Sequence, residues 1–335
     1  MNKTNRKASV KIVSCCLSLL MVMSLSLLAF SPASSVKHIN MKVDFASSFV
    51  NNQTGEFISE ITGAEGIKAL PYDFTAPQNK PKSKNYYKDG NKLCYKDSTI
   101  EVTCWTEKGK AFGSSAFFSE VKIKHPSQFR KQWSNGDYNS IKRQLPSTMF
   151  MNSNGVVGMS ADFYKFRRYG VIVQYGMVLC DKRCNHRLDV LVVDYEGNFH
   201  IWDDKELSKH IEKNGADDIM LSFTFGPALV IDGKVNDIES KRYENHTLGE
   251  LKQHVGRTGI GQLGDLHYLL CTVSKPGMRC QDIADIMGEK GCINAYNFDG
   301  GQSGTLLFDG QVYNEIAYKG VERPMSDIIY FASAE

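Results

Sequence analysis

The sequence lacks the short motifs that identify two common hydrolase classes. Neither a Gly-x-Ser-x-Gly elbow nor a His-Glu-x-x-His segment occurs in it, and this argues against a peptidase or hydrolase built on either motif. Positive charge is also limited, because the formal net charge is only +3 and part of that excess belongs to the N-terminus. Without a basic stripe along the chain, a nucleic-acid partner is not expected.

A complete zinc motif is missing as well. Cys180, Cys184 and His186 superficially resemble one half of a structural zinc site, but no matching second half follows. The sequence therefore does not predict a zinc centre and shows no required cofactor. The metal content of the site stays unknown, and a structural divalent cation held by a carboxylate is left open.

One long apolar run occurs, and it lies at the N-terminus. Basic residues within positions 3–11 precede an apolar segment over 12–30, and small residues follow it. This order is typical of a secretory signal. The run is nearly as long as a membrane span, so an uncleaved signal anchor is the alternative. We predict that residues 1–35 are a signal peptide or signal anchor. The protein is then secreted or extracytoplasmic, with membrane attachment through residues 12–30 left open.

Cysteine use agrees with export. Two of the nine cysteines lie in the N-terminal segment, so seven remain, enough for up to three disulfides in an oxidising compartment. A helix expected over 277–291 would hold Cys280 and Cys292 about 18 Å apart, beyond the roughly 7 Å between the Cα atoms of bridged cysteines. Cys271 and Cys292 are the better pair, and Cys94 is a candidate partner for Cys104.

The rest of the chain divides into two parts. Residues 36–97 are rich in proline and lysine and weakly periodic, which indicates a linker or stalk. From residue 98 onward, apolar and polar residues alternate at period two, as in Thr99–Trp105, and two helices are expected, over 205–214 and 277–291. We predict an α+β domain over 98–335, a strand-dominated mixed sheet with a few covering helices.

The segment 295–310 is the strongest candidate for a site. An apolar run ends at Asp299, the pair Gly300 and Gly301 follows, and polar residues precede a new apolar strand. Glycines permit backbone conformations closed to other residues, so such a turn can direct N–H groups at an anion. The competing interpretation is an ordinary strand connection in which Asp299 caps the turn.

Four segments in order resemble the phosphodiester glycosidase family. They are Gly158–Tyr164, Thr224–Val230, Arg257–Gly261 and Asn297–Ser303, and the closing Arg323–Ser326 also fits. Two positions differ from many relatives: Ser160-Ala161-Asp162 stands where a glycine-containing triplet is common, and Gln302 replaces a frequent glycine. The resemblance covers about 98–333 and implies hydrolysis of the bond between a sugar's anomeric carbon and a phosphodiester, in mammalian members one that links N-acetylglucosamine.

The resemblance also implies roles for individual residues. Asp299 and Asp162 become candidate catalytic carboxylates, and Arg257 becomes the candidate phosphate-binding cation, because a guanidinium can hold two phosphate oxygens. The candidate substrate-binding residues are Asn297, Gly300, Gly301, Gln302, Ser303 and Thr258. The implied substrate is an N-acetylhexosamine-type sugar phosphodiester in a cell-envelope or extracellular glycopolymer. A non-catalytic carbohydrate-binding or exopolysaccharide-assembly protein on the same fold is the alternative.

Overall fold

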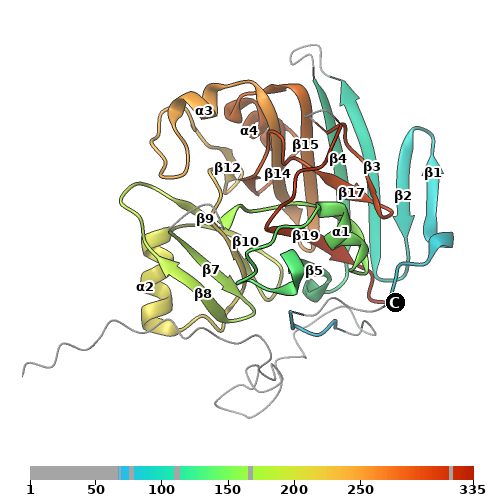
Figure 1. The fold of residues 1–335 in the computed structure, drawn as a ribbon, viewed down its shortest axis with the longest axis horizontal. Helices are drawn as coiled ribbons and strands as arrows, with labels where there is room; N and C mark the ends of the chain where they lie inside the picture. The colour runs from blue at the N-terminus through green and yellow to red at the C-terminus, as the bar shows by residue number, and fades with distance from the viewer. Residues whose placement is uncertain (1–66, 68, 75–78, 109–113, 165–168, 317–319) are drawn as a thin grey trace, which may run out of the picture. The chain divides into compact units, whose positions relative to one another are not determined.

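The computed structural model describes residue 67 and residues 69–74 and 79–335, apart from 109–113, 165–168 and 317–319 (Figure 1). The expected signal or anchor over 1–35 lies outside the described residues. Within the described part, no helix has both the length and the apolar character needed to span a bilayer.

Three antiparallel sheets form the framework of the domain. The largest has nine strands, in the order β1 (Tyr86–Asp89), β2 (Lys92–Lys96), β3 (Ile100–Lys108), β4 (Ser115–Ile123), β15 (His267–Met278), β14 (Val255–Gly264), β16 (Asn294–Phe298), β12 (Ala228–Ile231) and β13 (Lys234–Val235). A five-stranded sheet has the order β10 (Phe199–Asp203), β9 (Asp189–Asp194), β11 (Ile219–Phe223), β7 (Gly170–Gln174) and β8 (Met177–Lys182). The other five-stranded sheet runs β18 (Gln311–Val312), β17 (Leu306–Phe308), β6 (Gly155–Ser160), β19 (Asp327–Ala332) and β5 (Phe129–Trp133).

Helices cover the outer faces of these sheets. Helix α4 (Cys280–Glu289) packs on the nine-stranded sheet through its apolar stripe, Ile283, Ile286 and Met287, which recurs at helical spacing. The short helix α3 (Leu248–Lys252) contacts α4. Helix α2 (Asp204–Asn214) covers the β7–β11 sheet, and α1 (Pro146–Met151) covers the β6–β19 sheet.

The main core lies between the nine-stranded sheet and the two smaller ones. Phe298 from β16, Phe223 from β11 and Phe129 from β5 are completely buried in this one cluster. A strand can face two cores because its successive side chains alternate between faces. On β16, Tyr296 and Phe298 therefore point into the main core, while Ala295 packs with α4.

The fold-class prediction is confirmed. The domain is strand-dominated α+β, and the helices expected over 205–214 and 277–291 correspond to α2 and α4. Where a mixed sheet was expected, the ladders between named strands are antiparallel. Strands β7 and β8 form a hairpin, because Tyr175 and Gly176 both take positive φ and reverse the chain between them.

The expected boundary of the linker at residue 97 lies too late in the chain. Strands β1 and β2 fall inside 36–97 and extend the nine-stranded sheet, with β2 paired to β3. Tyr95 is 1% exposed and belongs to the main core. Residues 69–74 also dock on the domain, since the buried Arg130 donates to the carbonyls of Pro71 at 2.8 Å and Asp73 at 3.2 Å. Lysine and proline residues between these ordered segments give the stretch the composition of a linker, and for this reason the sequence did not indicate the two strands.

Removing residues 1–97 should therefore destabilise the domain. A chain that begins at Ser98 loses β1, β2 and the buried Tyr95, and it exposes the edge of β3. Losing a large buried side chain costs about 3 kcal/mol or more, and we expect a loss of that order in the free energy of unfolding. Urea unfolding should be compared with a chain beginning at Asn79, which keeps both strands. Equal midpoints and slopes for the two chains would contradict the expectation.

The expected disulfides are wrong for the described residues, because none of their seven cysteines forms a disulfide. Cys94 lies opposite Thr103 in the β2–β3 ladder, so Cys94 and the neighbouring Cys104 point to opposite faces of the sheet. Strand β14 lies between β15, which carries Cys271, and β16, which Cys292 precedes. Cys271 lies opposite Gly259 on β14, whereas the Cys292 side chain packs over Gly261, two residues further along β14, and the two thiols are not bridged.

Candidate functional site

The first and last of the sequence motifs meet where strands β6 and β16 end. The Asp299 N–H, one residue beyond β16, donates to the carbonyl of Ala161, one residue beyond β6, at 2.9 Å. This main-chain hydrogen bond places the Asp162 and Asp299 loops side by side, although the two aspartates are far apart in sequence. The side chain of Asp299 is partly exposed.

The glycine pair lets the Asp299 turn pack directly on β14. Gly301 has a φ of +58° and donates its N–H to the carbonyl of Gly256 at 2.6 Å. A Cβ atom on Gly300 would lie 2.5 Å from the same carbonyl and 3.1 Å from the Arg257 Cα. Only glycine fits so close to another main chain. The Asp162, Arg257 and Asp299 segments therefore converge at the level of the backbone.

The side chain of Asp162 has no exposed surface. Its Oδ1 accepts the N–H of Phe163 at 2.6 Å, and its Oδ2 accepts that of Thr224 at 3.0 Å. The Asp162 N–H in turn donates to Oδ1 of Asp327 at 3.0 Å, and Asp327 forms a buried ion pair with Lys131 at 3.0 Å. In this geometry the Asp162 carboxylate joins the β6 loop to the Thr224 segment, and Asp299 is the more accessible of the two candidate carboxylates.

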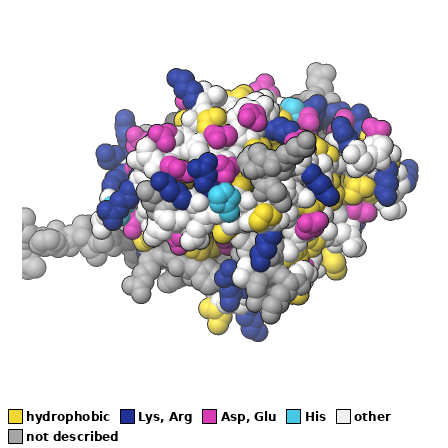
Figure 2. All heavy atoms as spheres, turned by 90° about the horizontal axis from the view of Figure 1, so that it is seen from above, with side chains coloured by type: hydrophobic (Ala, Val, Ile, Leu, Met, Phe, Trp, Pro, Cys, Tyr) yellow, Lys and Arg dark blue, Asp and Glu magenta, His cyan; other side chains and the backbone are white. Residues whose placement is uncertain are grey.

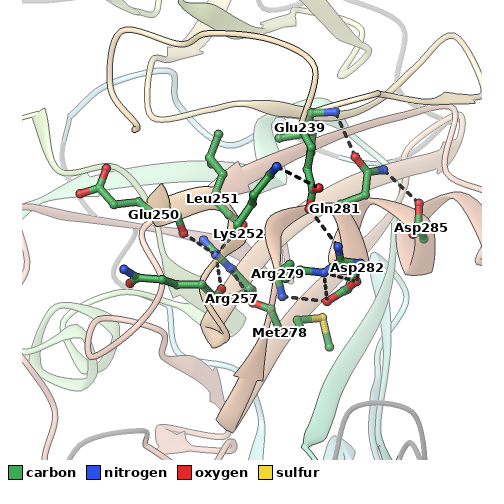
Figure 3. A network of polar contacts seen from close by, with 12 residues as sticks. Glu239, Glu250, Leu251, Lys252, Arg257, Met278, Arg279, Gln281, Asp282 and Asp285 are labelled. Atoms are coloured by element: carbon green, nitrogen blue, oxygen red, sulfur yellow. Dashed lines mark hydrogen bonds and ion pairs between the residues drawn. The ribbon is translucent and has the colours of Figure 1, made fainter. Parts of the chain in front are cut away.

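Arg257 is engaged mainly with main-chain carbonyls (Figure 3). Its Nη2 donates to the carbonyls of Glu250 at 2.9 Å, Leu251 at 3.1 Å and Gln253 at 2.9 Å, and its Nε donates to that of Met278 at 3.0 Å. Burial lowers the pKa of Arg257. The guanidinium thus holds the end of α3 on the sheet. The expected grip on a phosphate stays a prediction, for which Nη1 is the nitrogen not engaged by these carbonyls.

Replacing Arg257 with lysine should lower stability as well as turnover. An ammonium group is a compact donor without the planar fork, so it cannot serve both the α3 carbonyls and Met278. Unsatisfied buried acceptors cost about 1–3 kcal/mol, and we expect a loss of that size in the free energy of urea unfolding. A variant with unchanged stability but impaired turnover would instead assign Arg257 to phosphate binding, and one unchanged in both would remove it from the site.

The predicted substrate-binding residues lie on different sides of the turn. Gln302 is exposed beyond the glycine pair, and Ser303 is buried beside it. Asn297 is 2% exposed and donates through Nδ2 to the Gly226 carbonyl at 2.8 Å. Thr258 is fully buried, on the face of β14 opposite to Arg257. A direct contact with substrate therefore suits Gln302 better than Thr258.

Sequence reasoning did not assign a role to Arg323, which lies close to this turn. Arg323 is exposed, and its Nη1 is 3.5 Å from Oγ of Ser303. The signal was present in the sequence, since Arg323 opens the last of the family-like segments. Its position makes it a second candidate cation for an anion bound at the Asp299 turn.

Sequence reasoning also assigned no role to Asn245 and His246. Burial lowers the pKa of His246, which favours the neutral ring. Its Nε2 lies 2.8 Å from the Gly226 carbonyl and 3.2 Å from that of Phe225, so Nε2 carries the proton and Nδ1 is left as an acceptor. Asn245 donates to the carbonyls of Thr224 and Phe225. No motif in the sequence indicates a role for either residue.

The described residues contain no group of three His, Cys, Asp or Glu side chains placed to hold a metal ion. In the Cys180–His186 segment, Cys184 Sγ instead donates to the His186 carbonyl at 3.1 Å.

Comparison with known proteins identifies the family. A model of the phosphodiester glycosidase family matches residues 153–332, which include every converging segment described above. The chain belongs to the phosphodiester glycosidase family. Its site residues can therefore be weighed against hydrolysis of phosphodiester-linked sugars, the class of reaction that the family name describes.

Individual relatives of this phosphodiester glycosidase family member are distant. An SPbeta prophage-derived uncharacterized protein, YomE of Bacillus subtilis (strain 168), is 28% identical over 108 residues, 32% of this chain and 17% of that protein. The chain thus matches less than a fifth of that relative. The zebrafish N-acetylglucosamine-1-phosphodiester alpha-N-acetylglucosaminidase catalytic domain, auto-inhibited by its pro-peptide, has a TM-score of 0.57 at 13% identity, over 71% of this chain and 84% of that one. A hypothetical protein from Synechocystis has a TM-score of 0.50 at 12% identity, over 72% and 64%.

Proposed function

We propose that this protein is an exported hydrolase that cleaves a sugar-1-phosphodiester bond, of the N-acetylhexosamine type, in a cell-envelope or extracellular glycopolymer. The observation that carries the proposal is the convergence of the Asp299 turn with Ala161 and Gly256 in a member of the phosphodiester glycosidase family. The zebrafish relative is named for removing N-acetylglucosamine from such a bond, which motivates the choice of sugar.

The chemistry assigns different tasks to the residues around the turn. A phosphodiester leaving group is already a stabilised anion, so strong general-acid help is less necessary than for an ordinary glycoside. What is needed is a carboxylate near the anomeric carbon and donors for the phosphate. Asp299 supplies the accessible carboxylate. Arg323 and Nη1 of Arg257 are the candidate cations, and Asp162 orders the neighbouring loop through its main-chain bonds.

A non-catalytic carbohydrate-binding or exopolysaccharide-assembly protein is the alternative. One observation favours it: the charged groups of Asp162 and Arg257 are largely engaged by main chain, so fewer of the candidate groups face a substrate. With Asp162 engaged in this way, Asp162 and Asp299 do not form the pair of substrate-facing carboxylates whose separation distinguishes retaining from inverting glycosidases.

A release assay tests the proposal. A panel of sugar-1-phosphodiesters that vary in sugar and anomeric configuration should be incubated with the protein, with and without a chelator, and free sugar measured. Release from at least one N-acetylhexosamine phosphodiester is expected. Loss of release with chelator would show that a divalent cation is required. Binding without release from any member of the panel would favour the carbohydrate-binding alternative.

A further inference from the structure

A groove separate from the Asp299 turn lies beside the segment that connects β13 to α3. Its volume is about 540 Å³, within the range of about 300–1,000 Å³ for small-molecule sites. Residues 239–247 form its wall, with His186 and Glu250 at its borders. The groove adjoins the candidate site, because the Gly226 carbonyl accepts from His246 on the groove side and from Asn297 on the Asp299 side.

The wall of this groove is firmly anchored. Glu239 forms ion pairs with Arg279 at 3.1 Å and with Lys252 at 3.7 Å, and the Ile238 N–H donates to Gln281 at 3.0 Å (Figure 3). Helix α3, which follows the wall in the chain, is held by the hydrogen bonds from Arg257 to the carbonyls at its end. A wall tied to both α4 and the sheet presents its remaining polar groups in fixed positions, which reduces the entropic cost of binding a ligand.

Both hydrogen-bond donors and acceptors remain available along the groove. Arg242 is exposed and forms no ion pair or hydrogen bond with any described residue. Oδ1 of Asn245 is buried and has no protein partner there. Glu244 uses Oε2 to accept the His186 N–H at 2.8 Å, and its Oε1 accepts no hydrogen bond from the described residues. The lining therefore offers a guanidinium and a carboxylate oxygen to a ligand within a few residues, while the amide oxygen of Asn245 is buried in the wall.

This mixture of groups suits a neutral polyhydroxylated ligand better than an anion. Each sugar hydroxyl both donates and accepts a hydrogen bond, so a sugar can satisfy Arg242 and Glu244 together. A phosphate would meet the carboxylates of Glu244 and Glu250 at close range. Figure 2, the view from above Figure 1, likewise shows basic and acidic side chains interspersed on one face of the domain.

We propose that the groove beside Arg242, Glu244 and Asn245 is a sugar-binding subsite that holds a neutral sugar of the glycan outside the cleaved bond. The proposal rests on the proposed function for its position relative to the Asp299 turn, and it identifies the substrate as an oligosaccharide or polymer with at least one sugar beyond the phosphodiester. Binding itself requires no catalysis, so the groove can be tested independently.

Two trisaccharides without phosphate, of N-acetylglucosamine and of glucose, serve as probes for calorimetric titration of the full chain. Arg242→Ala removes an exposed side chain that forms no ion pair or hydrogen bond with the described residues, and Glu244→Gln keeps the hydrogen bond to His186, so both variants should fold. Each variant loses a hydrogen bond between a charged group and a sugar hydroxyl, and we expect each to bind the preferred trisaccharide about tenfold more weakly. Lys209→Ala, an exposed change on α2, is the matched control and should bind like the wild type.

Failure of both trisaccharides to bind the wild type, or equal affinity in wild type and both groove variants, would overturn the subsite. A second measurement separates this outcome from failure of the proposed function. Hydrolysis of a short sugar-1-phosphodiester without additional sugars should be unchanged in Arg242→Ala and Glu244→Gln, whereas the KM for a substrate with further sugars should rise. If no phosphodiester is hydrolysed but the trisaccharide result holds, the subsite stands and the proposed hydrolase activity falls.

Discussion

Asp299→Asn should reduce sugar release by roughly 100-fold or more, the usual scale for losing a general base or a charge-stabilising group. The substitution keeps the size and shape of the side chain but removes its negative charge and its ability to accept a proton. The Asp299 N–H bond to Ala161 and the glycine contacts with Gly256 involve only main chain, so the fold of the turn should be preserved.

The same variant distinguishes catalysis from turn capping. Asparagine serves turns as well as aspartate does, so a capping role predicts nearly normal activity. Release should be measured with the best substrate of the panel, alongside thermal unfolding and substrate binding. Wild-type activity in a folded Asp299→Asn protein would exclude a catalytic role. An inactive variant that still binds the phosphodiester with an unchanged melting temperature would support one. Lys209→Ala, an exposed change on α2 away from the site, is the control and should release sugar like the wild type.

Lys131→Met should have the largest effect on stability. The Lys131–Asp327 pair has no exposed surface on either side chain, and the Lys131 Nζ also lies 4.0 Å from the centre of the Trp133 ring. Removing one partner leaves the other charge buried without compensation, which costs about 3–5 kcal/mol. We expect a loss of that size in the free energy of unfolding measured in urea.

A double variant provides the matched control for this pair. Lys131→Met with Asp327→Asn removes both charges, and the amide oxygen can still accept the Asp162 N–H. Replacing a buried ion pair with uncharged groups is often nearly neutral, so the double variant should recover most of the lost stability. A Lys131→Met protein within about 1 kcal/mol of the wild type, well below the cost expected for a broken buried pair, would show that the ion pair is not needed for folding.

Local signals in the sequence were enough to predict much of the framework. The period-two pattern from Thr99 corresponds to β3, and the apolar spacing of Ile283, Ile286 and Met287 corresponds to the buried face of α4. These predictions succeed because alternation and helical spacing reflect which face of one element is buried. The family-like segments were recognisable for a related reason, since Gly300 must be glycine wherever this turn packs on β14.

The sequence could not show how the elements are combined. Strands β11 and β12 are consecutive in the chain but belong to different sheets, with the Thr224–Pro227 segment between them. That segment receives the Asp162 carboxylate, Asn297 and His246 from three other parts of the chain. Contacts of this kind depend on the register and packing of strands that are distant in the chain, and these produce no periodic pattern in the sequence.

The amino-acid sequence by itself determined the α+β class, the helices α2 and α4 and the candidate turn at Asp299, because each depends on residues close together in the chain. Only the tertiary structure decided the use of each charged group. The sequence placed Asp162 and Arg257 beside Asp299 as candidate catalytic residues, with Asp299 the leading one. In the structure, Arg257 is buried beside main-chain carbonyls and Asp162 beside main-chain N–H groups, and these give both residues partners within the fold. Asp299 keeps partial access to solvent because its strand ends at the rim of the sheet, where three loops meet.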